Sequence, residues 1–266
     1  MTAPERCVAF VTGAASGIGE ASAQLLAEQG MRVAVNAADA DAVVAAVERI
    51  TSAGGEAVAA VADVTDSAAV RAAVADVVAR FGRLDVLVAS AGIQRYGDIT
   101  ATSDELWAEV FAVNVTGTFL AVRECMPHLR RTHGSVVIIS SVQATVPQNE
   151  VVAYATSKGA LSALTRALAV DEARHGVRVN SIAPGSIDTP MLRSSAALFG
   201  DDPDAVVASW GSTHPLGRVG TPREVAEAVA FLAGEQARFI TGTELRVDGG
   251  LLTVLPAAVP PAERKD

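Results

Sequence analysis

Short apolar runs rich in valine, isoleucine and alanine alternate along this chain with longer segments whose apolar residues recur at helical spacing. The short runs are bounded by turn-forming or polar residues, a pattern that predicts β-strands. Because they are apolar almost throughout, we expect them to be buried on both faces, as in a parallel sheet covered by helices. Seven strands are predicted, at Val8–Val11, Arg32–Asn36, Ala57–Ala62, Val86–Val88, Ser135–Ile139, Arg178–Ile182 and Glu244–Val247.

The segments between these runs predict helices, at Ile18–Gln29, Asp41–Ala53, Ser67–Phe81, Asp104–Leu129, Val151–Arg174 and Pro222–Ala233. Several end at a glycine, the residue that commonly closes a helix; these are Gly30, Gly54, Gly82 and Gly176. The alternation of strands and helices predicts an α/β fold of the Rossmann type. It would be a doubly wound parallel sheet of about seven strands with helices on both faces, in a single domain spanning residues 1–255.

Two stretches depart from this alternation. Asp188–Arg218 is a long insertion before the last predicted helix, and we expect it to form a substrate lid. The final segment, "PAAVPPAERKD" at residues 256–266, is rich in proline and charge, which predicts a flexible C-terminal tail.

Composition and charge narrow the class of protein. No apolar run approaches the roughly 18 residues of a membrane span, and "MTAPER" leads directly into an apolar run, which predicts no signal peptide. The net charge of −9, without a basic cluster, argues against nucleic acid and anionic membranes. Two cysteines fit a reduced cytoplasm, and four scattered histidines predict no metal site. We therefore expect a cytoplasmic protein that acts on a small molecule.

A glycine-rich segment, "TGAASGIG" at residues 12–19, follows the first predicted strand. Gly13 would allow a tight turn, Gly17 would let the backbone approach a pyrophosphate, and Gly19 would let the helix pack on the strand. Such a turn can also be purely structural. Its place at the first strand–helix junction of an alternating chain favours dinucleotide binding.

The end of the second predicted strand bears on which dinucleotide binds. An acidic residue there contacts the ribose 2′-hydroxyl of NAD, whereas a base accommodates the 2′-phosphate of NADP. This chain has Ala37 and Ala38, with Asp39 and Asp41 beyond and no Arg or Lys from Val33 to Glu48. The two aspartates are equally well explained as helix N-caps. The absence of bases predicts NAD, with NADP as the alternative.

A tyrosine and a lysine share one predicted helical face, in "AYATSKGA". Lys158 lies four residues after Tyr154, and the only other lysine is Lys265. An adjacent ammonium lowers a phenol pKa of ~10 by about 1–3 units, which favours acid–base chemistry near neutrality. Alternatively, Tyr154 is a core aromatic and Lys158 a surface residue.

Two further polar residues occur in apolar surroundings. Ser141 ends a predicted buried strand at the edge where doubly wound sheets bind ligands. Asn114 lies inside an apolar helical stretch, where its amide needs hydrogen-bond partners. After the third predicted strand, Asp63 could meet an adenine amino group, while Asp66 or Ser67 caps the next helix.

Over essentially its whole length the chain resembles the classical short-chain dehydrogenase/reductase family. The resemblance rests on the ordered set TGAASGIG, Asp63-Val64, Ala91-Gly92, Asn114, Ser141, Tyr154-x-x-x-Lys158, Pro184-Gly185 with Thr189, and Val247-Asp248-Gly249-Gly250. It implies that Tyr154 is the general acid/base, Ser141 polarises the substrate oxygen, Lys158 binds the nicotinamide ribose, and Asn114 holds a relay water. It implies cofactor contacts at Gly13, Ser16, Gly17, Ile18, Gly19, Ala37, Asp63, Val64, Ser90, Ala91, Gly92, Tyr154, Lys158, Pro184, Gly185, Ile187 and Thr189.

The chain departs from the family pattern at two places. Ala89-Ser90 stands where Asn-Asn often precedes Ala-Gly, so an asparagine side-chain contact is lost. Neither the acid of NAD users, matching Ala37, nor the base of NADP users, matching Ala38 or Ser16, is present.

The expected activity is an NAD(P)-dependent interconversion of a secondary alcohol and a ketone, with a small polar alcohol such as a sugar or polyol as substrate. Polar residues near the predicted reacting centre favour this choice, although they could instead face solvent or a subunit interface. Candidate substrate contacts are Gln94, Ser141, Gln143, Asn149, Tyr154 and Met191.

Two alternatives remain open. A 3-oxoacyl-thioester reductase would, by resemblance, carry arginines at the positions of Thr132 and Val170. A non-enzymatic dinucleotide-binding regulator on this fold would be expected to lose Tyr, Lys or Ser, all of which are kept. The resemblance also suggests a homotetramer.

Overall fold

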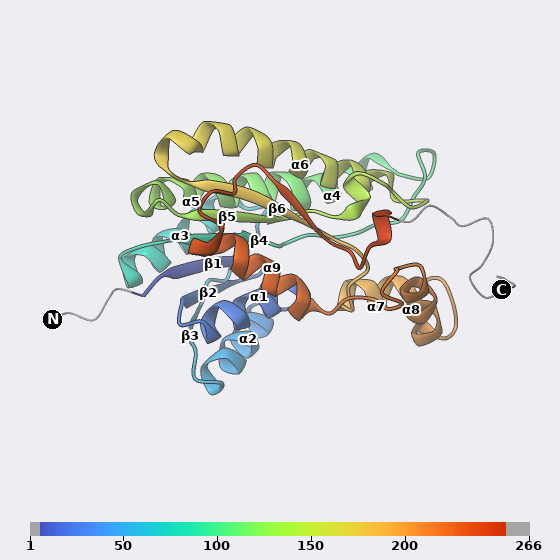
Figure 1. Ribbon diagram of the computed structural model, residues 1–266, viewed down its shortest axis with the longest axis horizontal. Helices are drawn as coiled ribbons and strands as arrows, with labels where there is room; N and C mark the ends of the chain where they lie inside the picture. Colours follow the sequence, from blue (N-terminus) through green and yellow to red (C-terminus); the bar gives the residue numbers. More distant parts are fainter. Residues whose placement is uncertain (1–5, 254–266) are drawn as a thin grey trace, which may run out of the picture.

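The computed structural model describes residues 6–253 of the chain, and all seven predicted strands are present in one parallel sheet. The order in the sheet is β3-β2-β1-β4-β5-β6-β7, so the direction of winding reverses between β1 and β4 (Figure 1). The strands are β1 Val8–Thr12, β2 Arg32–Asn36, β3 Glu56–Ala59, β4 Val86–Ala89, β5 Ser135–Ile139, β6 Arg178–Pro184 and β7 Glu244–Val247. The predicted tail, 256–266, lies outside the described residues.

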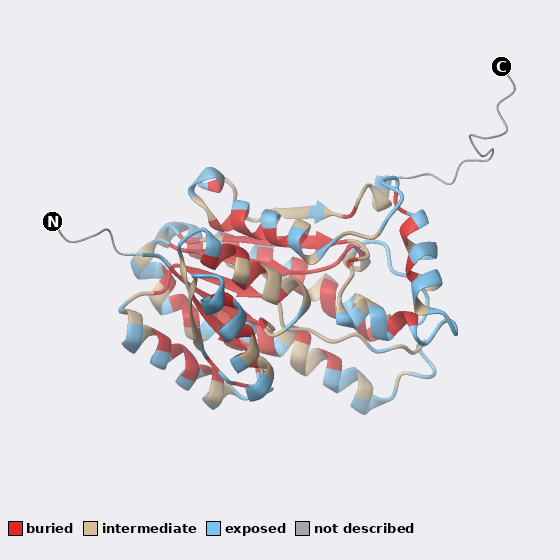
Figure 2. Ribbon diagram, turned by 90° about the horizontal axis from the view of Figure 1, so that it is seen from below, coloured by how far each residue is buried: buried red, intermediate tan, exposed pale blue. Residues whose placement is uncertain are grey.

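Two layers of helices cover the sheet, and each layer shares an apolar core with one face. Apolar residues of α1, α2 and α9 pack on one face, and those of α3, α5 and α6 pack on the other. The central strands are buried between the layers (Figure 2). The helices are α1 Gly17–Glu28, α2 Ala40–Ser52, α3 Ser67–Phe81, α4 Asp104–Phe111, α5 Thr118–Thr132, α6 Val152–Glu172, α7 Pro190–Ala196, α8 Pro203–Ser212 and α9 Pro222–Ala233.

Local capping explains why these helices start and stop where they do. Asp39 accepts a hydrogen bond from the backbone N–H of Ala42 at 3.0 Å, and Asp66 accepts from Ala68 and Ala69 at the start of α3. Asp39 and Asp66 are therefore N-caps, whereas Asp41 lies in the first turn of α2. The four glycines expected to close helices have positive φ values, between 73° and 89°.

The helix predicted over Asp104–Leu129 is present as a continuous helix, but it is not α-helical throughout. A π-helical segment, Ala112–Gly117, separates α4 from α5, and α5 continues to Thr132. By length and composition alone, Asp104–Thr132 is apolar enough to cross a membrane, contrary to the expectation that no segment would be. The fold accounts for this composition, because apolar residues of α5 such as Leu129 belong to the core on the sheet.

The third strand is shorter than predicted, ending at Ala59 rather than Ala62. The amide of Asn36, at the end of β2, donates to the carbonyl oxygens of Ala60 and Ala62 at 2.7 and 3.1 Å. The N–H groups of Ala60 and Ala62 still donate to the carbonyl oxygens of Val35 and Ala37, so the two segments stay paired beyond β3, with the Asn36 amide in place of backbone donors.

The insertion at 188–218 contains two helices, α7 and α8, which lie together at one end of the sheet (Figure 1). Thr189 and Asp202 cap them, and each helix has proline at its first position, Pro190 and Pro203. Arg193 of α7 bonds both Asp188 and Asp204, which ties the two helices together.

Candidate active site

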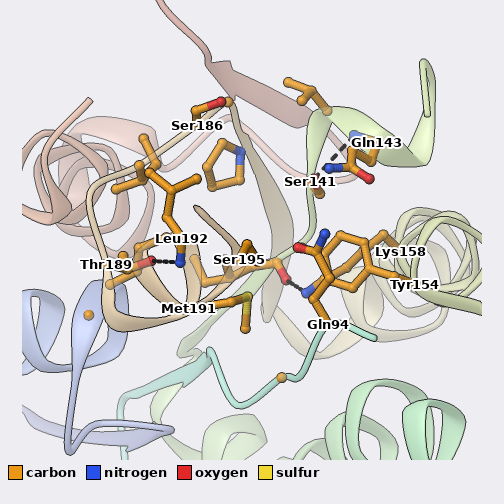
Figure 3. Close-up of a pocket in the computed structure, with 18 of the residues that line it drawn as sticks. Gln94, Ser141, Gln143, Tyr154, Lys158, Ser186, Thr189, Met191, Leu192 and Ser195 are labelled. Carbon is orange, nitrogen blue, oxygen red and sulfur yellow. Dashed lines mark hydrogen bonds between the residues drawn. The ribbon is translucent and has the colours of Figure 1, made fainter. Parts of the chain in front are cut away.

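A cavity of about 500 Å³ opens at the carboxyl ends of the central strands, beside the point where the winding reverses. Its walls come from the segments that follow β1, β4, β5 and β6, from the start of α6, and from α7 and α8. In Figure 3, Ser141, Tyr154 and Lys158 lie on one side of this cavity, and Ser186, Thr189 and Leu192 lie on the other.

The glycine segment forms one end of the cavity. A Cβ on Gly13 (φ +63°) would lie 2.8 Å from backbone atoms of Ala91, and one on Gly17 (φ +56°) would lie 3.3 Å from Thr189 Cγ2. Thr12 Oγ1 accepts hydrogen bonds from the N–H groups of Ser90 and Ala91, which fixes the β4 segment against this loop. The bare backbone and the N-terminus of α1 together form a cradle that fits a pyrophosphate.

Most of the predicted cofactor residues meet in the cavity wall. They are Gly13, Ser16, Gly17, Ile18, Gly19, Ser90, Ala91, Gly92, Tyr154, Lys158, Pro184, Gly185, Ile187 and Thr189. Three do not line it. Ala37 packs against the core, the carboxylate of Asp63 accepts from the N–H and hydroxyl of Thr65 at 2.8 Å, and Val64 is buried.

Tyr154 and Lys158 lie on one face of α6, and both are buried, with 7% and 4% of their surface exposed. Lys158 Nζ donates to the carbonyl oxygen of Ile139 at 2.9 Å and lies 5.5 Å from the centre of the Tyr154 ring. The alternative that Lys158 is a surface residue is therefore wrong.

The pKa values differ in direction from the sequence-based expectation. Burial raises the pKa of Tyr154 to about 12, partly offset by its hydrogen bond with the Ser141 hydroxyl. Burial lowers the pKa of Lys158 to about 8. In this pocket, removing the phenol from water outweighs any stabilisation of the phenolate by the nearby ammonium, so the protein holds Tyr154 as the phenol at neutral pH.

Ser141 lies directly after β5, at the cavity, and its side-chain oxygen accepts from the N–H of Gln143 at 3.1 Å. Because that bond uses a lone pair, the Ser141 proton is left for a partner in the cavity, which is the Tyr154 oxygen in the free protein. Gln143 also lines the cavity, and its Oε1 is buried without a hydrogen-bond partner.

Asn114 lies in the π-helical segment and does not line the cavity. Its Oδ1 accepts from the N–H of Ile93 at 2.8 Å, and its Nδ2 donates to the Ile93 carbonyl and to Ser157 Oγ. A Cβ on Gly92 would lie 3.3 Å from Asn114 Oδ1 and 3.5 Å from Lys158 Nζ. The buried amide thus has its partners, and it fixes the segment after β4 next to the lysine.

The substrate residues predicted from sequence divide into two groups. Gln94, Ser141, Gln143, Tyr154 and Met191 line the cavity, whereas Asn149 is exposed and does not. Asn149 is in a turn whose next residue, Glu150, has a positive φ of 59° and accepts from the Gly97 N–H, and this turn carries Asn149 away from the cavity.

Sequence reasoning missed several wall residues: Tyr96, Ser195, Trp210, Leu251 and Leu252. Two of them carried a signal. Tyr96 is one of only two tyrosines and follows Gln94 by two residues, and Trp210 falls within the predicted lid. Across residues 6–253, no three His, Cys, Asp or Glu side chains lie together as a metal site would require.

Comparison with known proteins gives the same class as the fold and the cavity. The family model described as "Enoyl-(Acyl carrier protein) reductase" matches residues 13–252. Short-chain reductase protein NovJ of Streptomyces niveus is 42% identical over 247 residues, covering 92% of this chain and 94% of that protein. L-fucose dehydrogenase of Oryctolagus cuniculus is 40% identical over 272 residues, covering 96% and 93%.

A solved structure gives the same result in three dimensions. The crystal structure of an actinorhodin polyketide ketoreductase variant with NADPH superposes with a TM-score of 0.90 at 35% identity, covering 94% of this chain and 99% of that one.

The sheet order, the glycine cradle and the buried Tyr154–Lys158 pair define a nicotinamide-dinucleotide oxidoreductase of the doubly wound class. The chain belongs to the short-chain dehydrogenase/reductase family. It is an oxidoreductase that acts on CH–OH groups, with NAD(P) as the hydride carrier.

Proposed function

We propose that this protein interconverts a secondary alcohol and a ketone on a sugar or polyol, with NAD as the preferred cofactor. The observation that carries the proposal is Gln143 Oε1, a buried acceptor without a partner in a cavity that also holds Gln94 and Gln148. Leaving such a group unpaired costs about 1–3 kcal/mol, so the site favours a substrate that brings a hydroxyl to it. The likeness to L-fucose dehydrogenase supports this substrate class.

The cavity residues divide the chemistry between them. The glycine cradle would hold the pyrophosphate of NAD, and the bound cofactor would supply hydride acceptance in oxidation and hydride donation in reduction. The Ser141 hydroxyl donates a hydrogen bond to the substrate oxygen. In oxidation the Tyr154 phenolate takes the hydroxyl proton, and in reduction the phenol gives it back. The Lys158 ammonium, 5.5 Å from the centre of the Tyr154 ring, would favour the phenolate at pH values below its own pKa of about 8.

Cofactor choice rests on the turn between β2 and α2. Ala37 and Ala38 offer no base to a 2′-phosphate, and the carboxylate of Asp39 is held at the N-terminus of α2. A 2′-phosphate at this helix end would meet that carboxylate, so the turn favours NAD. We also propose that the protein is a homotetramer, that it is cytoplasmic, and that residues 188–218 form the substrate lid.

A ketoreductase acting on a larger oxo substrate is the second candidate. Met191, Leu192, Leu251 and Leu252 give the cavity an apolar wall, and both the NovJ reductase and the NADPH-bound polyketide ketoreductase are similar over nearly the whole chain.

A substrate panel separates the two candidates. Purified protein is assayed with sugars, polyols and hydroxy acids in the oxidative direction, and with 3-oxoacyl thioesters and simple ketones in the reductive direction, using each cofactor. We expect turnover of sugars or polyols with NAD. Efficient reduction of long 3-oxoacyl thioesters, with no turnover of sugars or polyols, would contradict the proposal.

A single substitution tests the observation that carries it. Replacing Gln143 with Ala removes the acceptor, so we expect KM for a sugar to rise about ten-fold, the equivalent of one ordinary hydrogen bond, with little change for a simple ketone. Gln29→Ala, at an exposed glutamine after α1, is the matched control. An equal change in KM for sugar and ketone would show that Gln143 does not bind the substrate hydroxyl.

A further inference from the structure

A buried histidine joins the lid to the loop after β6. His214 follows the C-terminus of α8, and only 3% of its surface is exposed. Its Nδ1 lies 3.0 Å from the carbonyl oxygen of Trp210, in the last turn of α8. Its Nε2 lies 3.2 Å from the backbone nitrogen of Ser186. The ring thus touches both segments without lining the large cavity itself.

These two partners determine which ring nitrogen carries the proton. The Ser186 N–H can only donate, so Nε2 must accept and carries no proton. The neutral ring therefore has its proton on Nδ1, which donates to the Trp210 carbonyl. That carbonyl stands at the C-terminal, negative end of α8, where a donor is favoured. The imidazole acts as a connector with one donor and one acceptor.

The surrounding backbone is shaped to admit the ring. A Cβ on Gly185 would lie 3.0 Å from His214 Nε2, and one on Gly249 would lie 3.5 Å from His214 Cβ. A side chain at Gly185 would therefore crowd the nitrogen that reaches Ser186. The Ser186 carbonyl accepts from the Gly220 N–H at 2.9 Å, so the backbone N–H and carbonyl of Ser186 are both hydrogen-bonded.

From Trp210 the contacts continue across the cavity wall. The Trp210 ring centre lies 6.0 Å from that of Phe199, which lies 5.1 Å from that of Tyr96, both in edge-to-face geometry. Trp210 and Tyr96 line the cavity, as does Ser186. A continuous series of contacts therefore runs from the loop after β6, through His214, to the lid and to the far wall.

We propose that His214 is a positioning residue that sets the lid's Trp210 relative to the loop at Ser186. Through this connection, a cofactor seated along the loop after β6 affects the position of Trp210 in the cavity wall. The inference rests on the proposed function in one respect, that the cofactor binds along this loop.

Two substitutions separate positioning from mere packing. His214→Phe keeps a ring of similar shape with neither donor nor acceptor, whereas the amide oxygen of His214→Gln can still accept from the Ser186 N–H. We expect His214→Phe, which loses both hydrogen bonds, to raise substrate KM about ten-fold, with a smaller change in kcat. His214→Gln should stay within about three-fold of the parent, because one bond is kept.

Tryptophan fluorescence tests directly whether cofactor binding affects Trp210. The chain has two tryptophans, so in a Trp107→Phe background Trp210 is the only emitter. We expect oxidised NAD, which does not absorb tryptophan emission, to change Trp210 fluorescence in this background and to lose that effect when His214→Phe is added.

Each outcome has a distinct meaning. An undiminished fluorescence response together with parental KM in His214→Phe would overturn the inference. So would equal losses of activity and melting temperature in the Phe and Gln variants, since a packing role predicts that result. If the parent protein binds neither cofactor in calorimetric titration, the proposed function fails first, and independently of His214.

Discussion

At the residue scale, the chemistry depends on a phenol that the protein keeps protonated. Burial raises the pKa of Tyr154 to about 12, so the free protein is set to donate a proton, as reduction requires. Oxidation needs the phenolate. Because its population rises with pH, kcat/KM for alcohol oxidation should rise across the neutral and alkaline range.

Tyr154→Phe removes the proton donor and acceptor without changing the packing of the ring. General acid–base catalysis contributes about 10²–10⁴-fold, so we expect turnover to fall by that factor while calorimetric titration still shows cofactor binding. Steady-state rates over a pH series check both statements, because the residual activity should no longer depend on this group. Retention of more than about a tenth of the activity would contradict the assignment.

The sequence predicts the neighbours in the site better than it predicts their charge states. Tyr154 and Lys158 are four residues apart on a helix, and Ser141 ends a buried strand, so local geometry alone brings them to one edge. The pKa direction depends on burial by lid and sheet segments distant in sequence. That is why the expected lowering of the Tyr154 pKa was wrong.

At the element scale, the strands were predictable because a doubly buried strand shows a continuous apolar run. The π-helical segment within the helix that begins at Asp104 was not predictable, because apolar periodicity does not distinguish an α-helix from one that contains a π turn. Asn114, an amide in an apolar stretch, was the available signal. Helices α7 and α8 could also have been predicted from Thr189-Pro190 and Asp202-Pro203, each a capping residue followed by proline.

The β2–α2 turn carries a prediction of its own. Because Ala38 is exposed and no base is near, we expect the parent protein to bind NAD more tightly than NADP, and Ala38→Arg to shift the preference toward NADP. Calorimetric titration with both cofactors measures the ratio. Ala53→Arg, at the exposed other end of α2, adds the same charge about 20 Å away and should leave the ratio unchanged. Tighter NADP binding by the parent protein would refute the preference.

At the scale of the whole molecule, the winding of the sheet places the site. Strand order reverses between β1 and β4, so the segments that follow them diverge and leave room at the carboxyl edge for a ligand. The two cores on either side of the sheet are apolar, and Lys158 is brought into this interior with only a carbonyl oxygen as its hydrogen-bond partner. Burying this lysine lowers the stability of the fold and places its amine beside Tyr154 in the site.

Lys158 should make global stability depend on pH. Burial lowers its pKa to about 8 from the ordinary 10.5, so between these values the unfolded chain binds a proton that the folded protein does not. The free energy of unfolding should therefore rise with pH across this window. Below this pH window, the folded protein holds a desolvated ammonium. Lys158→Met should therefore be more stable than the parent at neutral pH by on the order of 1–3 kcal/mol.

Denaturant titrations of the parent and Lys158→Met between about pH 8 and pH 10 measure this effect. Tyr154, with its pKa raised from 10.0 to about 12, acts in the opposite direction near the top of this window, but it is present in both proteins and so affects both curves alike. The lost bond to Ile139 lowers the variant's stability equally at every pH, so it does not alter the slope. The stability advantage of Lys158→Met over the parent should shrink as pH rises. Lys158→Arg stays charged throughout this range, so its stability should not approach that of Lys158→Met as pH rises. Parallel stability curves for the parent and Lys158→Met would show that the buried lysine does not titrate in this window.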